Sequence, residues 1–179
     1  MKKPVQYLLF SMILILATQA YSQSSGTPGL EFVVELRVTT DKVRIVGQTP
    51  YGERRIIPIT GGTFEGPGMK GVVLPGGADY QFVNSDNTRT SIEAIYSIQT
   101  EDGFTIHIRN RGVVYITENQ LKERMDGKPF DWEQIYFRAA PVFDAPIDSP
   151  YNWLNNAIFV CKGVPGGDGN VSIIVWKVL

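Results

Sequence analysis

The sequence predicts an all-β fold, a single antiparallel β-barrel of about nine or ten strands with one or two short helical turns. Short segments of alternating apolar and polar residues fill most of the chain, turn residues separate them at close intervals, and glycine gathers in one region. Many short strands at such spacing are typical of a sandwich or a barrel. Glycine within strands favours the barrel, because it marks bulges and sharp corners.

The N-terminal segment predicts export of the protein. Lys2 and Lys3 precede an apolar run from Tyr7 to Ala17, and small residues then lead to a cleavage position before Gln23. This order is typical of a secretory signal peptide, and the run is shorter than the ~20 residues that a membrane-spanning helix needs. We therefore expect a signal peptide at 1–22, a flexible mature N-terminus at 23–29, a barrel domain at 30–179, and a periplasmic or extracellular location.

The first expected strand shows the clearest alternation. Phe32, Val34, Leu36 and Val38 fall on one face, and Val33, Glu35 and Arg37 fall on the other. Such a pattern is typical of a strand with one buried side. The expected strands are Glu31 to Thr40, Val43 to Gly47, Arg54 to Glu65, Gly71 to Leu74, Tyr80 to Val83, Ser91 to Thr100, Phe104 to Ile116, Gln134 to Phe143, Ala157 to Lys162 and Val171 to Leu179.

The connections between these strands carry recognisable signals. Asp102-Gly103 joins two alternating runs, a pattern that predicts a β-hairpin. The segment from Glu118 to Met125 predicts a helix of one or two turns that stops at Gly127, and residues 151–156 predict a helical turn. Among the glycines at 61, 62, 66, 68, 71, 76 and 77 we expect bulges, barrel corners or close backbone contacts, with some ordinary turns.

Composition argues against several classes of function. Removing residues 1–22 takes two lysines and no acid, so the formal charge moves from −1 to −3. Lysine and arginine are scattered, which disfavours nucleic acid and membrane surfaces as partners. Cys161 is the only cysteine and His107 the only histidine, so we expect no internal disulfide and no metal site. Hydrolase, phosphate-loop and dinucleotide motifs are missing, and we expect no cofactor.

Several motifs occur in an order that resembles one known family. They are Ile59-Thr60-Gly61-Gly62-Thr63-Phe64-Glu65-Gly66-Pro67, Leu74-Pro75-Gly76-Gly77-Ala78-Asp79-Tyr80, Glu101-Asp102-Gly103, Arg109-Asn110-Arg111-Gly112, Tyr136-Phe137-Arg138 and Trp153-Leu154-Asn155. Together they resemble the Domain of Unknown Function 3237 family, also called the UPF 0311 group, over residues 30–179. The resemblance implies a small barrel, lipocalin-like in shape, but it does not imply any particular activity. The export segment is a departure from many relatives.

Strand alternation predicts a candidate site inside the barrel. Polar residues share one face in three strands, and small barrels either fill their interior or hold one small ligand there. If these polar faces point inward, the lumen is a polar pocket with two guanidinium groups, suited to a carboxylate, enol or phenol oxygen. The candidate ligand-binding residues are Asp79, Gln81, His107, Arg109, Tyr136 and Arg138 in the lumen, Glu65 and Asn155 near a rim, and Trp153 as an apolar lining residue. The alternative for each is a polar face in water, with Arg109 or Arg138 pairing with Asp79.

Three functions fit this pattern. The first is an exported barrel that binds a small oxygenated or anionic organic ligand in its lumen, as a monomer or a homo-oligomer. The second is a cofactor-independent isomerase, lyase or hydrolase. In it, Asp79 or Glu65 would act as acid or base, and Arg109 or Arg138 would stabilise an oxyanion. The third is a structural or partner-binding protein of the envelope. A filled lumen and an exposed apolar patch would favour this last reading.

Overall fold

The computed structural model describes residues 26–128, 131–166 and 169–179 and contains ten antiparallel strands. The expected signal peptide lies outside the described residues. All ten expected strands are present, with boundaries shifted by a few residues. The strands are β1 (Leu30–Thr40), β2 (Arg44–Thr49), β3 (Gly52–Gly66), β4 (Met69–Val73), β5 (Ala78–Val83), β6 (Arg89–Thr100), β7 (Thr105–Tyr115), β8 (Tyr136–Asp144), β9 (Phe159–Pro165) and β10 (Asn170–Val178).

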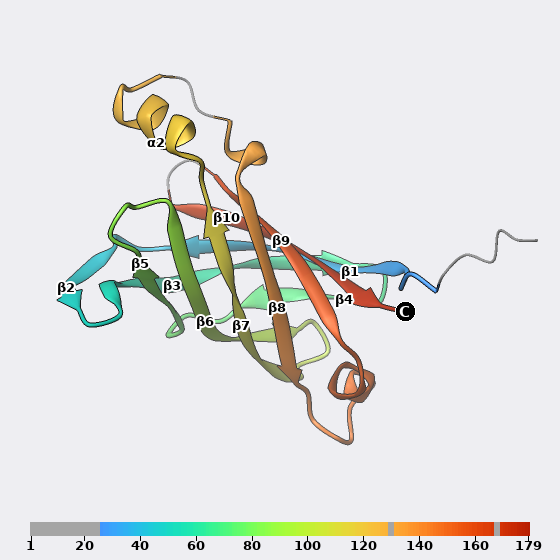
Figure 1. Cartoon of the computed structure of the whole chain (residues 1–179). Coiled ribbons are helices and arrows are strands. Elements are labelled where there is room, and N and C mark those ends of the chain that lie inside the picture. The colour runs from blue at the N-terminus through green and yellow to red at the C-terminus, as the bar shows by residue number, and fades with distance from the viewer. Residues whose placement is uncertain (1–25, 129–130, 167–168) are drawn as a thin grey trace, which may run out of the picture.

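The strands close into a barrel, which confirms the predicted fold class (Figure 1). The order runs from β1 through β10, β9, β8, β7 and β6, and β3 closes the ring by pairing with β1. Between β6 and β3, two short strands share one position: β5 pairs with residues 53–58 of β3, and β4 pairs with residues 63–66. Strand β2 extends the other edge of β3 beyond β1. The barrel thus has eight positions around its circumference, one of them shared by β4 and β5, and β2 lies outside the ring.

Two glycines allow neighbouring backbones to approach closely, one where β3 closes the ring against β1 and one between β4 and β6. Gly62 in β3 has φ 133°, and a Cβ atom there would lie 2.1 Å from the carbonyl oxygen of Arg37 in β1. Gly71 in β4 has φ 158°, and its Cβ would lie 2.1 Å from the carbonyl oxygen of Gln99 in β6. Side chains are excluded at both positions, which confirms the expected close backbone contacts.

The inward faces of the strands form one apolar core that fills half of the barrel. Its largest fully buried side chains are Phe159, Leu36, Ile98, Ile106, Ile108 and Leu154. Leu154 comes from η2 (Asn152–Asn156), the predicted helical turn, which lies at this end of the barrel. Phe159 packs edge-on against Phe143 with ring centroids 4.9 Å apart. Because β4 pairs with this half of β3 and β6, it forms the wall around the core.

The opposite end of the barrel carries the predicted helix, α2 (Glu118–Met125), and the turn η1 (Trp132–Gln134). Helix α2 begins at Thr117 with a capping box. The Thr117 hydroxyl accepts the backbone N–H of Gln120, and the Gln120 side chain accepts the backbone N–H of Thr117. The helix ends before Gly127, which has φ 68°. None of its residues is buried, so α2 lies over the barrel end and is no part of the core.

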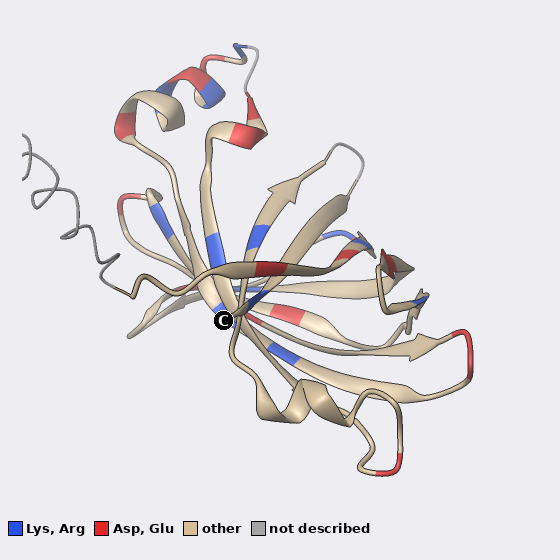
Figure 2. Cartoon of the chain, turned by 90° about the vertical axis from the view of Figure 1, so that its right-hand side faces the viewer, with Lys and Arg blue, Asp and Glu red and all other residues tan. Residues whose placement is uncertain are grey.

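Charged residues of both signs are interspersed over the fold, as Figure 2 shows for α2 and the strands. Many of them form ion pairs on the outer surface, including Lys70–Glu101 at 2.8 Å and Lys177–Glu31 at 3.2 Å. Among the described residues, we find no helix with the length and hydropathy needed to cross a membrane.

Candidate functional site

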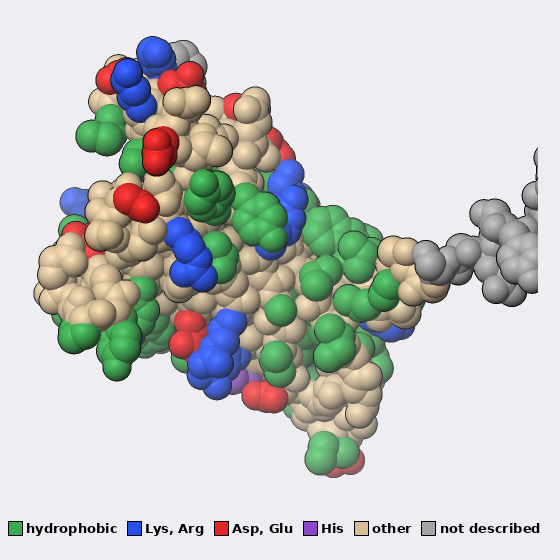
Figure 3. All heavy atoms as spheres, viewed as in Figure 1, with side chains coloured by type: hydrophobic (Ala, Val, Ile, Leu, Met, Phe, Trp, Pro, Cys, Tyr) green, Lys and Arg blue, Asp and Glu red, His purple; other side chains and the backbone are tan. Residues whose placement is uncertain are grey.

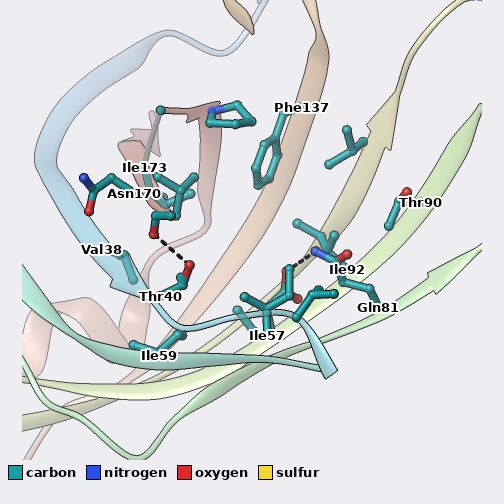
Figure 4. A pocket seen from close by; sticks show the side chains of 18 of the residues that line it. Val38, Thr40, Ile57, Ile59, Gln81, Thr90, Ile92, Phe137, Asn170 and Ile173 are labelled. Atoms are coloured by element: carbon teal, nitrogen blue, oxygen red, sulfur yellow. Dashed lines mark hydrogen bonds between the residues drawn. The ribbon is translucent and has the colours of Figure 1, made fainter. Parts of the chain in front are cut away.

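The second half of the barrel contains a cavity of about 540 Å³ (Figure 4). Its walls are mainly apolar, and they come from β1, β3, β5, β6, β7, β8 and β10. The apolar lining includes Val38, Ile57, Ile59, Ile92, Ala94, Val114, Phe137, Val171 and Ile173, and the polar lining includes Thr40, Arg55, Asp79, Gln81, Thr90, Tyr96, Asn110 and Asn170. The core and the cavity therefore divide one lumen between them.

Among the described residues, Asp79 is the one acidic residue that lines the cavity. Gln81 donates a hydrogen bond of 2.6 Å to Oδ2 of Asp79, and the backbone N–H of Glu93 donates one of 3.2 Å to Oδ1. Burial raises the pKa of Asp79, and these two hydrogen bonds oppose the rise. No described cationic side chain forms an ion pair with it. A carboxylate has about four acceptor sites, so Asp79 retains capacity for a ligand.

Two further polar side chains line the cavity where it meets the core. Tyr96 and Asn110 project inward from β6 and β7, and both are buried. Burial raises the pKa of Tyr96, and negative charge on Cys161 or Asp79 acts in the same direction, so its phenol stays protonated. Among the described residues its hydroxyl has no hydrogen-bond partner. Asn110 donates to Sγ of Cys161 at 3.4 Å, which orients its amide.

Two arginines line the cavity wall. Arg55 of β3 is held by an ion pair with Glu53 two residues earlier on the same strand. Arg124 of α2 lies over the ring of Trp132, 5.2 Å from its centroid, and both line the cavity. Both arginines therefore have partners of their own within the chain.

The interior positions predicted for four residues are wrong. His107 and Arg109 of β7 and Tyr136 and Arg138 of β8 project outward from the barrel. The reason is the pleat of each strand: Ile106 and its apolar neighbours on the same face fill the interior, so the alternate residues must face water. Only β5 places its polar face inward, bringing Asp79 and Gln81 into the cavity.

The outward residues bind to each other or to the backbone. Arg109 and Arg111 both contact Oε1 of Glu93, at 2.6 and 2.8 Å. His107 Nδ1 lies 3.1 Å from the hydroxyl oxygen of Ser97 on the outer face. Arg138 donates to the carbonyl oxygen of Phe137 at 2.9 Å. These contacts are surface interactions, and the pairing of Arg109 or Arg138 with Asp79 is absent among the described ion pairs.

The remaining three candidates also lie away from the cavity. Glu65 is exposed on β3 opposite Lys70 of β4. Asn155 accepts the backbone N–H of Ala145 at 2.8 Å and donates to its carbonyl oxygen at 2.9 Å, so it holds the loop before η2. Trp153 packs against Phe159 at the core end of the barrel, with ring centroids 6.0 Å apart.

Sequence reasoning missed Arg55, Thr90, Tyr96, Asn110 and Asn170. For Tyr96 and Asn110 a signal was present, since each is a polar residue on the otherwise apolar face of an alternating strand. Such a residue points into the lumen if its face does. In the described ranges 26–128, 131–166 and 169–179, no three His, Cys, Asp or Glu side chains gather closely enough to hold a metal.

Comparison with known proteins places this barrel among similar ones. A family model described as "Protein of unknown function (DUF3237)" matches residues 28–178. A UPF0311 protein of Rhodopseudomonas palustris is 36% identical over 155 residues, which cover 86% of this chain and 99% of that protein. The match spans nearly all of the relative, so the barrel region alone makes up a complete protein there.

Solved structures share the fold. The crystal structure of a conserved protein of unknown function from R. palustris has a TM-score of 0.78 and 33% identity, covering 87% of this chain and 100% of the other. A β-barrel-like protein from Acinetobacter baumannii has a TM-score of 0.75 and 32% identity, covering 88% and 100%. A structure described as an enzyme from Penicillium herquei has a TM-score of 0.62 and 26% identity, covering 87% and 98%. From its sequence and its barrel, this chain belongs to the DUF3237 (UPF0311) family.

Proposed function

We propose that the protein binds a small, neutral and mainly apolar organic molecule inside the barrel, with a hydroxyl group of the ligand on Asp79. One observation carries this proposal: among the described residues, a mainly apolar cavity is lined by one acidic side chain, Asp79, and no described cation forms an ion pair with it. Cavities of ~300–1,000 Å³ hold drug-sized ligands, and a few polar groups then fix the orientation. The cavity of about 540 Å³ lies within this range.

The charge of the cavity favours a neutral ligand over an anionic one. The sequence-based expectation of an anionic ligand depended on the guanidinium groups of Arg109 and Arg138, and both groups lie outside the lumen. An anion placed beside Asp79 would meet its carboxyl group, and the two cations that line the cavity are engaged elsewhere, Arg55 with Glu53 and Arg124 over the ring of Trp132. Burying two like charges next to each other is costly. A hydroxyl group can donate to the ionised carboxylate, and the Tyr96 phenol supplies a donor for a second oxygen on the ligand.

Thermal shift measurements on the chain from Gln23 test this function. The panel contains neutral hydroxylated aromatic and alicyclic compounds and carboxylates of matched size. A neutral compound at a hundred times its dissociation constant should stabilise the parent by ~2.7 kcal/mol, a shift of several degrees. Asp79→Leu should remove this shift, whereas Arg109→Ala, on the outer face, should retain it. A panel in which only carboxylates bind, or in which Arg109→Ala also loses the shift, would contradict the proposal.

A second candidate function is a cofactor-independent enzyme that uses the same cavity. Two observations favour it: burial raises the pKa of Asp79, as is common for catalytic acids and bases, and a structure at 26% identity is described as an enzyme. Asp79 would take a proton from a carbon of the bound molecule and return it to another position. Gln81, Tyr96 or Asn110 would stabilise the oxyanion, because Arg109 and Arg138 lie outside the cavity. Glu65 also lies outside it, which leaves Asp79 as the acid or base.

Deuterium exchange distinguishes this enzyme from a binding protein. A ligand found by thermal shift is incubated with the protein in D₂O and followed by NMR. An enzyme should exchange a carbon-bound hydrogen or rearrange the ligand, and Asp79→Asn should stop the reaction while binding persists. Unchanged ligand after long incubation would leave binding as the function.

The proposed setting is the periplasm or the extracellular space. It is supported by the positive start, the apolar run and the small residues before Gln23. Expression of the full chain should yield a protein that begins at Gln23 in the exported fraction, which N-terminal mass spectrometry detects. An intact N-terminus in the cytoplasmic fraction would contradict this setting.

A further inference from the structure

The outer surface of the barrel carries an apolar patch at the core end, away from the cavity. Hydrophobic side chains gather on the right-hand part of the molecule in Figure 3, toward the C-terminus. We define this patch, the C-terminal patch, by side chains from β1, β8, β9, β10 and the residues next to them. Its exposed members are Leu30, Phe32, Val142, Ile158 and Leu179, and its half-buried members are Val160, Trp176 and Val178.

Strand register makes the C-terminal patch continuous. Phe32 of β1 pairs with Trp176 of β10, which in turn pairs with Val160 of β9. Leu30 pairs with Val178, whose N–H donates to the carbonyl oxygen of Ile158 at 2.9 Å. Two neighbouring cross-strand rows are thus apolar on the face where a barrel in water usually places polar residues.

The patch is large enough to bury a specific contact. Leu30, Val142, Ile158 and Leu179 are 56, 61, 71 and 67% exposed, and Phe32 is 42% exposed. With the half-buried members, these side chains offer roughly 600 Å² of apolar surface, or about 1,200 Å² for two such faces together. This total lies at the lower end of the range for specific protein interfaces.

We propose that the C-terminal patch binds the same patch on a second copy of this chain, forming a two-fold symmetric dimer. Two identical twisted sheet faces can stack with their strands ~30° apart, so the surface is complementary to itself in shape. The bordering lysines are paired within the chain, Lys177 with Glu31 and Lys162 with Glu133, so a symmetric contact opposes no unpaired cations at these positions. The same pairing leaves these lysines poor binders of anionic lipid.

The dimer leaves the proposed ligand cavity open. The patch surrounds the end of the barrel that the apolar core fills, whereas the cavity is lined by α2 and by the turn before β10 at the other end. Dimerisation and ligand binding are therefore separate properties, and either can fail without the other.

Sedimentation velocity of the chain from Gln23, between about 1 µM and about 1 mM, tests the dimer. A contact at the lower end of the size range is expected to be weak, so the parent should shift from monomer to dimer within this range of concentration. The double variant Val142→Lys with Ile158→Lys should weaken dimerisation at least tenfold. The matched control, Ile45→Lys with Val46→Lys, changes equally exposed residues on β2 and should dimerise like the parent.

Three results would overturn the proposal. They are a parent that stays monomeric at every concentration, a dimer that the patch variant does not weaken, and a monomer that floats with neutral phosphatidylcholine vesicles through the patch. The last result would assign this face to a membrane surface. If the lysine variant fails to fold, as circular dichroism would show, Ile158→Ser makes the same test at a residue whose side chain is 71% exposed.

Discussion

A matched pair of substitutions on β6 tests the division of the lumen into a core half and a cavity half. Ile92 and Ile98 lie on the same inward face of the same strand and are 5 and 0% exposed. Both belong to the buried hydrophobic cluster, but Ile92 also lines the cavity, whereas Ile98 does not. Each change to alanine removes three carbon atoms, which costs about 2.4 kcal/mol in transfer free energy.

The two positions differ in what replaces the missing atoms. At Ile98, a void of ~80 Å³ adds about 2 kcal/mol, for a total loss near 4 kcal/mol in the free energy of unfolding. At Ile92 the neighbouring space is already open, so we expect a loss of ~2 kcal/mol or less. Urea unfolding should therefore separate the midpoints of the two variants by about 1 M, given a slope near 2 kcal/mol/M. Equal losses at the two positions would refute the open cavity.

Three further changes give distinct results. Asp79→Asn should stabilise the protein at neutral pH and have little effect below the pKa of the unfolded carboxyl. Burial raises the pKa of Asp79 in the folded protein above its value in the unfolded chain. Protonated Asp79 therefore stabilises the fold fully at low pH, and this stabilisation is lost as the pH rises through the native pKa. Melting temperatures from pH 3 to 8 measure the effect. Gly62→Ala should cost more than ~2 kcal/mol in urea unfolding, because its Cβ would overlap the Arg37 carbonyl, while Gly68→Ala, with open space, should cost under ~1 kcal/mol. Thr117→Ala should cost helix α2 about 1 kcal/mol, seen as faster hydrogen exchange at its first turn, with no change in global unfolding because α2 buries nothing.

The fold could be predicted because the strand alternation, the turn residues and the glycine positions all agree with a closed barrel. Alternation in β1 and β7 requires one buried face, Asp102-Gly103 fixes the hairpin between β6 and β7, and Gly127 ends α2. The barrel closure was supported by Gly62, where a side chain would collide with β1. These are local signals, and local signals determine strands and turns well.

The site could be predicted only in part, because alternation separates two faces without saying which is inside. On β7 the polar face lies outside, and on β5 the polar face lies inside. The difference depends on partners: Asp79 pairs with Ala94 and Ile57, whose side chains line the same cavity, whereas Arg109 shares its outward face with Glu93. That information depends on strand register across the closed ring, which the sequence of a single strand does not contain.

Strands β4 and β5 occupy one position in the barrel, and each forms the wall of a different half of the lumen. Strand β4 walls the packed core, while β5, with Asp79 and Gln81, walls the cavity, and residues 74–77 join them. Six consecutive residues can therefore change the chemistry of the cavity wall while every inward side chain of β4 stays in place. Exchange of residues 78–83 would therefore replace Asp79 and Gln81 of the proposed ligand site and leave the inward side chains of β4 in place.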